Sequence, residues 1–223
     1  PNDDVNMSQS SNDVIPTAIK LSAYMDLTKK LFPALDGLIK SINDKADSLK
    51  GTIKTGRTHL MDAMPIDFSE ELKAWSSQLE SSKEMLNVIE KKFLELSQGG
   101  TAVGSGINAH KQFAKLFAQE ITKLTKNKYK FTPAKNFYHE LSAQDCSVQL
   151  SGELKNLAVI LMKISNDLRW MNSGPLAGIS EIELKALQPG SSIMPGKVNP
   201  VIPEAVAMAS ADVIGNDVSI TVA

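Results

Sequence analysis

The chain has 223 residues and a formal net charge of −1. This length allows one large domain or two small ones, and the near-neutral charge gives no reason to expect nucleic acid as a partner. The single cysteine, Cys146, excludes a framework of internal disulfides and is typical of a reducing compartment. No signal peptide is visible, and no apolar run approaches the roughly 20 residues that cross a bilayer, so we expect no membrane partner.

Apolar residues recur at steps of three and four along three stretches of the chain, which predicts three long helices. Strand signals are nearly absent, so the expected fold is all-α. Pro33 interrupts the first stripe, but the pattern resumes beyond it, and we expect a kink in one helix rather than two helices. The stripes comprise Tyr24, Leu27, Leu31, Leu35, Leu38 and Ile42; Leu72, Trp75, Leu79, Leu86, Ile89, Phe93 and Leu96, with Ser82 in the one skipped place; and Leu154, Leu157, Leu161, Ile164, Leu168 and Met171.

The predicted helices are long for a chain of this size. A helix of about 30 residues is about 45 Å long, whereas a compact globule of this size has a radius of gyration of about 17 Å. Helices of that length, lying side by side, make an elongated bundle of long helices. A thin bundle cannot bury apolar stripes on several faces by itself, so we expect other subunits to cover them.

A polar segment runs from Asn2 to Asp13 and leads directly into the first predicted helix. Ser and Asn side chains before an apolar-periodic run are typical N-caps, and Pro16 is suited to an early helical turn. Capping needs only one or two such residues, however. The other hydroxyls and amides, at the positive end of a helix, predict a carboxylate site.

A second polar segment, Thr55 to Pro65, lies between the first two long helices and contains His59. This histidine is expected in a loop beside Arg57 and Thr58 rather than on an apolar face, which makes it the leading titratable candidate near neutral pH. No His or Cys cluster has the spacing of metal ligands, so we predict no metal site.

The third segment, Gly190 to Pro200 (GSSIMPGKVNP), carries two hydroxyls, a cation and an amide in what we expect to be a mobile loop. Such loops bury little and are costly to order, so packing does not account for this composition, which suits a small polyanion. Glu204 follows in the first turn of the next helix, where a carboxylate favours the helix dipole. A carboxylate also suits the second nitrogen of a catalytic histidine, but the spacing does not say whether Glu204 meets His59.

These segments resemble the fumarase/aspartase superfamily, and within it the class II fumarases. Gly190 to Pro200 matches the signature loop of the superfamily, and further fumarase-type segments follow in order over essentially the whole chain. They are Pro1 to Thr17 (PNDDVNMSQSSNDVIPT), Gly56 to Leu60 (GRTHL), Gly99 to Asn108 (GGTAVGSGIN), Asn166 to Gly174 (NDLRWMNSG) and Gly215 to Asp217 (GND).

The resemblance implies that residues 1–223 are the central helical-bundle domain of a homotetramer, without its flanking N- and C-terminal domains. In the superfamily, each active site draws its three segments from three different subunits. The implied reaction is the reversible anti addition of water to fumarate, which gives (S)-malate in the tricarboxylic acid cycle, without a cofactor. The implied compartment is the cytoplasm, or the mitochondrial matrix in a eukaryote.

The resemblance also implies roles for single residues. Ser191 would remove the C3 proton of malate, and Lys197, Asn199 and backbone N–H groups would stabilise the aci-carboxylate that results. His59, paired with Glu204, would act at the water end of the substrate. The carboxylates of the substrate would be held by Thr58, Ser10, Ser11 and Asn12, and an accessory anion site would retain Asn2, Asp3 and Asn6.

Two other functions stay open. Aspartases of this superfamily usually have Gln where this chain has His59, so a sister lyase such as aspartate ammonia-lyase fits less well than a hydratase. A non-catalytic helical assembly core is the other alternative. The chain also departs from the family pattern, which usually has Arg at the position of Leu176, Gln at that of Met61 and Thr at that of Met64.

Overall fold

The computed structural model describes residues 2–126 and 129–223, so Pro1, the first residue of the N-terminal motif, lies outside the described residues. The chain packs as two compact units. Unit one comprises Pro1–Ser41 and Lys83–Leu150, and unit two comprises Ile42–Ser82 and Ser151–Ala223. The unit boundaries fall within long helices rather than in linkers, and the assignment of residues 1–223 to one central domain stays a prediction.

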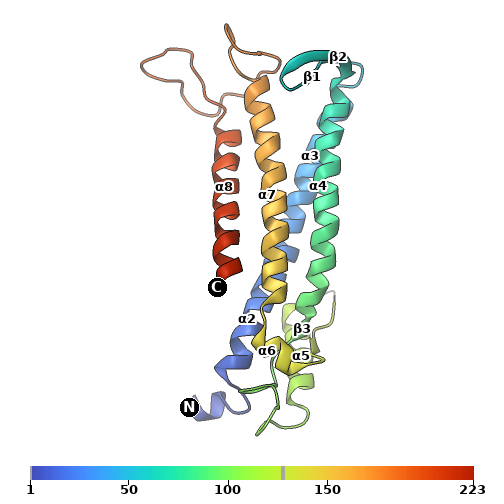
Figure 1. Cartoon of the computed structure of the whole chain (residues 1–223), viewed down its shortest axis with the longest axis vertical. Coiled ribbons are helices and arrows are strands. Elements are labelled where there is room, and N and C mark those ends of the chain that lie inside the picture. The colour runs from blue at the N-terminus through green and yellow to red at the C-terminus, as the bar shows by residue number, and fades with distance from the viewer. Residues whose placement is uncertain (1, 127–128) are drawn as a thin grey trace. The chain divides into compact units, whose positions relative to one another are not determined.

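Long helices dominate both units (Figure 1), which confirms the predicted all-α class. Helices α3 (Phe32–Ser48), α4 (Phe68–Glu90) and α7 (Asp145–Met171) each contribute to both units. The other elements of unit one are α1 (Asn2–Val5), α2 (Ser11–Asp26), the π-helix η1 (Leu27–Leu31), the 3₁₀-helix η2 (Lys91–Leu94), β3 (Glu95–Leu96), α5 (Phe113–Thr125), β4 (Thr132–Pro133) and α6 (Phe137–Ser142). Unit two adds β1 (Ile53–Thr58), β2 (Met61–Asp67) and α8 (Val201–Val222).

The second apolar stripe is buried along its whole length, as its spacing predicts. Leu79 and Leu86 have no exposed surface, and Ser82, in the skipped place, is 2% exposed. Burial of the small Ser82 shows that the stripe is a continuous packed face of α4. The first stripe is less complete, because Leu38 lies at the surface. The buried members of the other two stripes are Tyr24, Leu27, Leu35, Leu157, Ile164 and Met171.

The first helix continues through Pro33, as predicted, because α2, η1 and α3 follow one another without a break. The turn before Pro33 is the π-helix η1, at whose end the Phe32 N–H donates to the carbonyl of Leu27. A proline inside a helix clashes with the carbonyl four residues before it, here that of Lys29. The wider π turn accommodates the proline without ending the helix.

The prediction of a loop over Thr55 to Pro65 is wrong, because this segment forms most of the antiparallel pair β1 and β2. His59 and Leu60 are its two-residue turn, with φ of 53° and 62°. Hairpin turns of type I′ require this left-handed pair. The sequence hid the strands because neither alternates clearly between apolar and polar residues and because Pro65 interrupts the second.

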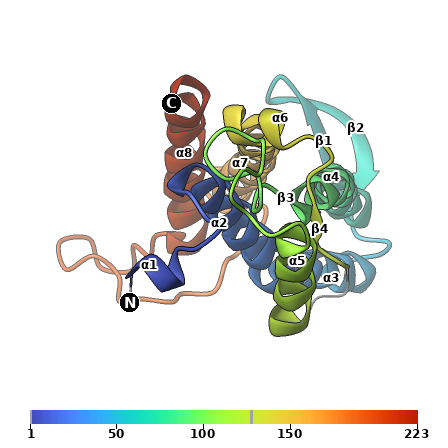
Figure 2. The same ribbon diagram turned by 90° about the horizontal axis from the view of Figure 1, so that it is seen from below.

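A second small sheet in unit one was not predicted either. Strands β3 and β4 are parallel, with Glu95 opposite Thr132, and β4 runs beside α5 (Figure 2). Phe131, just before β4, packs edge-on against Tyr24 of α2 with ring centroids 5.3 Å apart. Its N–H donates to Thr122 Oγ1 of α5 at 3.0 Å. Strands of two residues are too short to leave a pattern in the sequence.

Helix α8 contradicts the expectation that no segment is suited to a membrane. By length and composition alone it is long and apolar enough to cross a bilayer, and little of it is buried. One such helix is weak support for a membrane protein. Moreover, α8 carries the buried Asp217, which accepts hydrogen bonds from Ser151 and Lys155 of α7 at 2.8 and 2.5 Å. These bonds join α8 to its neighbour α7 (Figure 1).

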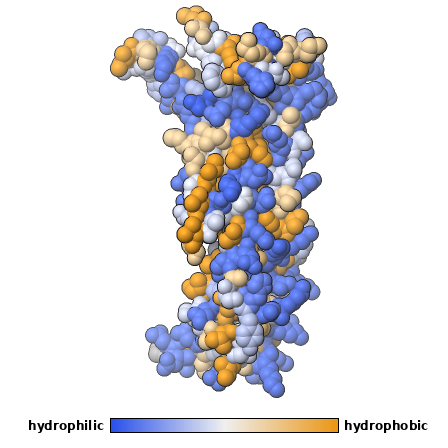
Figure 3. Space-filling model, viewed as in Figure 1, coloured by the Kyte–Doolittle hydropathy of each residue, from blue (hydrophilic) through white to orange (hydrophobic). Residues whose placement is uncertain are grey.

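The apolar side chains of α8 are largely uncovered within this chain. An apolar stripe runs over this helix on the face that Figure 3 shows. Uncovered apolar surface of this kind on a helix is typical of a face that packs against another chain. The exposed large apolar residues of α8 are Ile202, Met208, Val218, Ile220 and Val222.

In unit one, a buried carboxylate joins the N-terminal motif to a distant loop. Asp13 has no exposed surface, and its Oδ1 accepts the Ser10 N–H at 2.9 Å. Its Oδ2 accepts the N–H groups of Gly99 and Thr101 at 3.0 and 2.9 Å. Gly99 has φ of 110°, and a Cβ there would lie 2.5 Å from the Cβ of Ala114, so only glycine fits this approach. The GGTAVGSGIN segment is thereby fixed against the start of α2.

Replacing Asp13 with Ala removes the acceptor of three backbone N–H groups. A buried donor left unsatisfied costs about 1–3 kcal/mol, so we expect the free energy of unfolding to fall by at least about 3 kcal/mol in urea titrations. Asp26→Ala on the same helix is the matched control, because the Asp26 side chain is 65% exposed and pairs with Lys30, one turn away. Equal losses in the two variants would contradict the role of Asp13.

Candidate functional site

The structure separates the predicted site residues into three groups, one in unit one and two in unit two. Two cavities of unit two each hold members of one group. The groups are Ser10, Ser11 and Asn12 at the start of α2; Thr58 and His59 at the turn of the hairpin; and Ser191, Lys197, Asn199 and Glu204 in the signature loop and the first turn of α8.

The first group is engaged in local hydrogen bonds. Ser10 is the N-cap of α2, and its Oγ accepts the N–H of Asn12 at 3.2 Å, which confirms the predicted capping. Asn12 Nδ2 donates to the carbonyl of Ala102 at 2.8 Å, while Ser11 is exposed. A carboxylate-binding role for these residues stays a prediction. So does the accessory anion site, whose members are exposed in and just after the single turn of α1: Asn2, Asp3 and Asn6.

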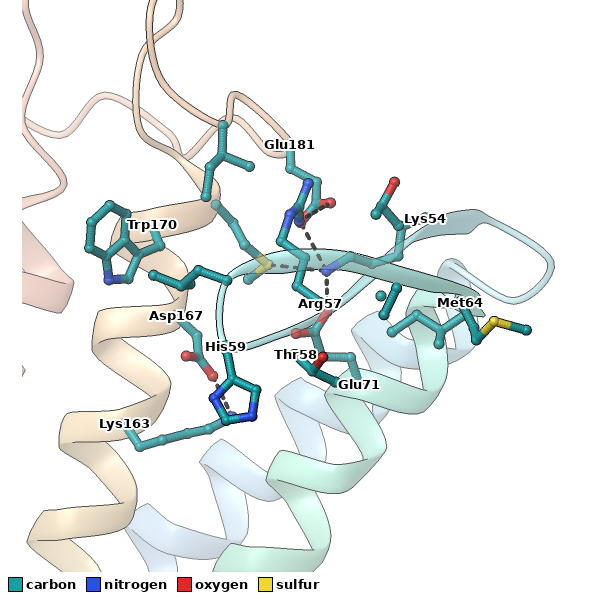
Figure 4. Close-up of a pocket in the computed structure, with 17 residues that line it drawn as sticks. Lys54, Arg57, Thr58, His59, Met64, Glu71, Lys163, Asp167, Trp170 and Glu181 are labelled. Atoms are coloured by element: carbon teal, nitrogen blue, oxygen red, sulfur yellow. Dashed lines mark hydrogen bonds and ion pairs between the residues drawn. The ribbon is translucent and has the colours of Figure 1, made fainter.

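The hairpin helps to line a cavity of about 640 Å³ in unit two. Helix α7 contributes Lys163, Asp167 and Trp170 to the same cavity (Figure 4). His59 points from the hairpin turn toward Lys163 and Asp167, which form an ion pair with each other (Figure 4). Thr58 and His59 are both exposed, so the hairpin presents these side chains rather than burying them.

A network of ion pairs lies at the base of the hairpin. Lys54 of β1 is 8% exposed; it pairs with Glu71 of α4, and its Nζ lies 2.8 Å from Glu181 Oε2. Arg57 of the same strand donates from Nη1 to Glu181 Oε1 at 3.0 Å. The Lys54 ammonium also lies 5.0 Å from the centroid of the Phe68 ring, within cation–π range. The network therefore joins the hairpin to α4 and to the segment that follows α7.

The charges in this network hold one another ionised. Burial alone would raise the pKa of Glu181, but hydrogen bonds from Lys54 and Arg57 outweigh it and hold that pKa below its ordinary value. Burial alone would lower the pKa of Lys54, but hydrogen bonds to Glu181 and Glu71 raise it. Lys54, Glu71 and Glu181 were not predicted from the sequence, because a lone Lys in a strand and two distant Glu residues leave no local pattern.

The second cavity, of about 620 Å³, is lined by three residues that the sequence predicted in the third polar segment and the helical turn after it. Lys197 and Asn199 of the signature loop and Glu204 of α8 line it with the last turn of α7 and the residues that follow. Within residues 2–126 and 129–223, no hydrogen bond or ion pair is made by these three side chains. Polar groups that line a cavity without intramolecular partners are available to a ligand.

Ser191 lies in a compact turn at the start of the signature loop. Its Oγ accepts the N–H groups of Ile193 and Met194 at 3.3 and 3.2 Å. Its own N–H donates to the carbonyl of Lys197 at 3.0 Å, and the N–H of Lys197 donates to the carbonyl of Met194 at 3.1 Å. Gly196 completes the turn with φ of 82°. The segment thus has internal hydrogen bonds, whereas its composition had predicted a mobile loop.

The predicted pairing of His59 with Glu204 is not made within this chain. His59 lines the first cavity and Glu204 the second, although Trp170 lines both. The pairing stays a prediction for two copies of the chain.

The three departures from the family pattern all lie at the surface. Met61 and Met64 of the hairpin are 70% and 77% exposed, and Leu176, after α7, is 98% exposed. Packing within the chain therefore does not depend on these side chains.

Replacing Glu181 with Gln removes the negative charge between Lys54 and Arg57. A two-stranded hairpin is marginal by itself, so we expect amide hydrogen exchange over β1 and β2 to be faster by about tenfold, which corresponds to about 1.4 kcal/mol of local stability. Glu183→Gln is the matched control, because that residue is exposed and lines neither cavity. Unchanged exchange in the Glu181 variant would contradict the network's role.

Comparisons with known proteins agree with this geometry. A family model described as "Lyase" matches residues 1–215. A class II fumarate hydratase of Pseudomonas aeruginosa is 55% identical over 223 residues, which are 100% of this chain and 48% of that protein. A class II fumarate hydratase of Bacillus subtilis is 48% identical over 220 residues, 99% of this chain and 47% of that protein. This chain thus spans about half the length of the curated relatives it matches.

Solved structures agree as well. The crystal structure of a class II fumarase from Schistosoma mansoni has a TM-score of 0.94 and 40% identity, and the match covers 97% of this chain and 48% of that one. A fumarate lyase:delta crystallin structure from Brucella melitensis has a TM-score of 0.93 and 43% identity, covering 100% of this chain and 48% of that one. The chain belongs to this lyase family, the fumarase/aspartase superfamily, and corresponds to its central helical part.

Proposed function

We propose that the whole protein is a fumarate hydratase, which adds water reversibly to fumarate to give (S)-malate. The observation that carries the proposal is the second cavity, where Lys197, Asn199 and Glu204 lie without intramolecular partners beside the turn that holds Ser191. Relatives at 48% and 55% identity bear the name of this activity. The bacterial relatives and the single cysteine favour the cytoplasm as the compartment.

Ser191 is the proposed base that removes the C3 proton of malate. A serine hydroxyl is a poor base at neutral pH and needs its alkoxide stabilised. The two backbone N–H groups that point at Oγ, from Ile193 and Met194, favour the charged form of the hydroxyl. The Lys197 ammonium, in the same loop, adds a positive charge. Hydrogen bonds made to Oγ thus support an acid–base role for this serine.

Lys197 and Asn199 are the proposed partners of the substrate carboxylate that takes up charge. Removal of the C3 proton leaves a carbanion, which is stored as an aci-carboxylate with a second negative charge. A cation and an amide donor in fixed positions stabilise that charge as it forms. This chemistry needs only side chains and backbone N–H groups, so we propose that no cofactor takes part.

We further propose that copies of the chain build each site together, as a homo-oligomer that is a tetramer by family resemblance. His59 and Glu204 line different cavities of one chain, and Ser10, Ser11 and Asn12 belong to the other unit. The exposed hairpin is suited to reach a neighbouring copy, where Thr58 and His59 would meet Glu204, Lys197 and Asn199. His59 would then act at the water end of the substrate.

Proton NMR of fumarate, incubated with the full-length protein in the presence of ammonium, tests the function directly. Malate is the expected product. Aspartate would instead identify a sister ammonia-lyase and overturn the role of His59. Neither product, with the oligomer intact by light scattering, would favour the alternative of a non-catalytic assembly core.

Replacing His59 with Gln tests the residue that favours water over ammonia. We expect kcat for hydration to fall by about 10²- to 10⁴-fold, the usual contribution of a general acid–base group, with no change in oligomeric state. His110→Gln is the matched control, because His110 is exposed before α5 and lines neither cavity. Undiminished hydration by the His59 variant would refute the assignment.

A further inference from the structure

We propose that Arg169 binds a carboxylate of the substrate, as a second cation beside Lys197 in the second cavity. This inference rests on the proposed function and extends it, because Arg169 belongs to the NDLRWMNSG motif, to which no chemical role was assigned above. The residue lies in the last turn of α7 and lines the same cavity as Lys197, Asn199 and Glu204.

The exposed guanidinium of Arg169 makes one local hydrogen bond and leaves its other N–H donors unpaired. Its Nη1 donates to Asn166 Oδ1 at 3.0 Å, one turn earlier on α7. An arginine has five N–H donors in a planar fork, and this is the one hydrogen bond of its side chain among the described residues. No carboxylate in the described part of the chain pairs with it. The other donors are therefore available to a carboxylate, which an arginine binds through two parallel hydrogen bonds.

The charges of the cavity match a dicarboxylate. Its lining has two cations, Arg169 and Lys197, and a single carboxylate, that of Glu204. Two other polar residues of the lining are already engaged. Asn172 Oδ1 accepts the Leu184 N–H at 2.8 Å, and Ser173 Oγ donates to the Trp170 carbonyl at 2.7 Å. The positively charged donors of the cavity thus lie on two side chains, Arg169 and Lys197, one for each carboxylate of a four-carbon substrate.

A purely structural role for Arg169 makes a different prediction. A cation near the C-terminal end of a helix stabilises the helix dipole, and Arg169 occupies such a position in α7. In that role Arg and Lys are equivalent, and the affinity for a ligand does not depend on the residue. At a bidentate carboxylate site, in contrast, Lys does not replace Arg.

The test is calorimetric titration of the full-length protein with succinate, a dicarboxylate without a double bond to hydrate. We compare wild type, Arg169→Gln, Arg169→Lys and the control Lys185→Gln, a change at an exposed cation that lines neither cavity. Butyrate, with one carboxylate, is titrated in parallel. Trp170, which is 54% exposed and lines the cavity, gives an independent fluorescence readout.

We expect Arg169→Gln to weaken succinate binding by about 10- to 100-fold, the usual effect of losing a hydrogen bond to a charged group. We expect Arg169→Lys to weaken it by about tenfold without a change in melting temperature. Butyrate binding should change less, because only one carboxylate needs a cation, and Lys185→Gln should bind succinate like wild type.

Wild-type affinity for succinate in both Arg169 variants would overturn the inference. If Arg169→Gln does not fold, Arg169→Lys decides, because it keeps the charge at the helix end. Malate formation by wild type, followed separately, distinguishes the two proposals. If the wild type hydrates fumarate but the Arg169 variants bind succinate like wild type, only the role of Arg169 is refuted. If the wild type does not hydrate fumarate, the proposed function itself is refuted.

Discussion

The ion pairs of Glu181 with Lys54 and Arg57 are the interaction on which the presentation of the hairpin depends. Two strands without a third have little apolar surface to bury, and Met61 and Met64 are exposed. Charged groups with 8% to 25% of their side-chain surface exposed therefore hold the strands against α4 and the segment after α7. The turn of the hairpin therefore lies at the surface, where the His59 side chain is exposed rather than packed in the core of its own unit.

The other polar segments also combine a buried carboxylate that fixes the segment with polar residues that lie at the surface or line a cavity. Asp13 is buried and holds backbone, while its neighbours Ser11 and Asn12 lie at the surface. In α8, Asp217 is buried and bonded to α7, while Glu204 faces a cavity without a partner. In both cases a buried carboxylate fixes the position of a segment, and another polar residue of that segment, Ser11 or Glu204, is exposed or lines a cavity without a partner. That pattern supports a site assembled from several copies.

Much of the fold was predictable, because buried helices leave a period of three to four in the sequence. The spacing of the apolar residues from Leu72 to Leu96 predicted a buried helix face, and Ser82, in the skipped place, is buried with them. The hairpin was not predictable in this way, because its strands have one neighbour and no buried apolar face to impose alternation. Site residues that share a short segment, such as Lys197 and Asn199, were found from composition. Lys54 and Arg169 were not found in this way, since the Glu residues that pair with Lys54 and the loop residues that share a cavity with Arg169 lie far away in the sequence and come together only in the folded chain.

The central claim is that His59 and Ser191 of different copies act at one site. The direct measurement mixes two full-length variants, His59→Gln and Ser191→Ala, dissociates and reassociates them, and follows malate formation. If the two residues come from different chains, equal mixing restores about a quarter of the wild-type sites, because each contributing chain is the right one half the time. Hybrid oligomers that form, by native mass spectrometry, yet stay inactive would show that both residues act within one chain and would contradict the account.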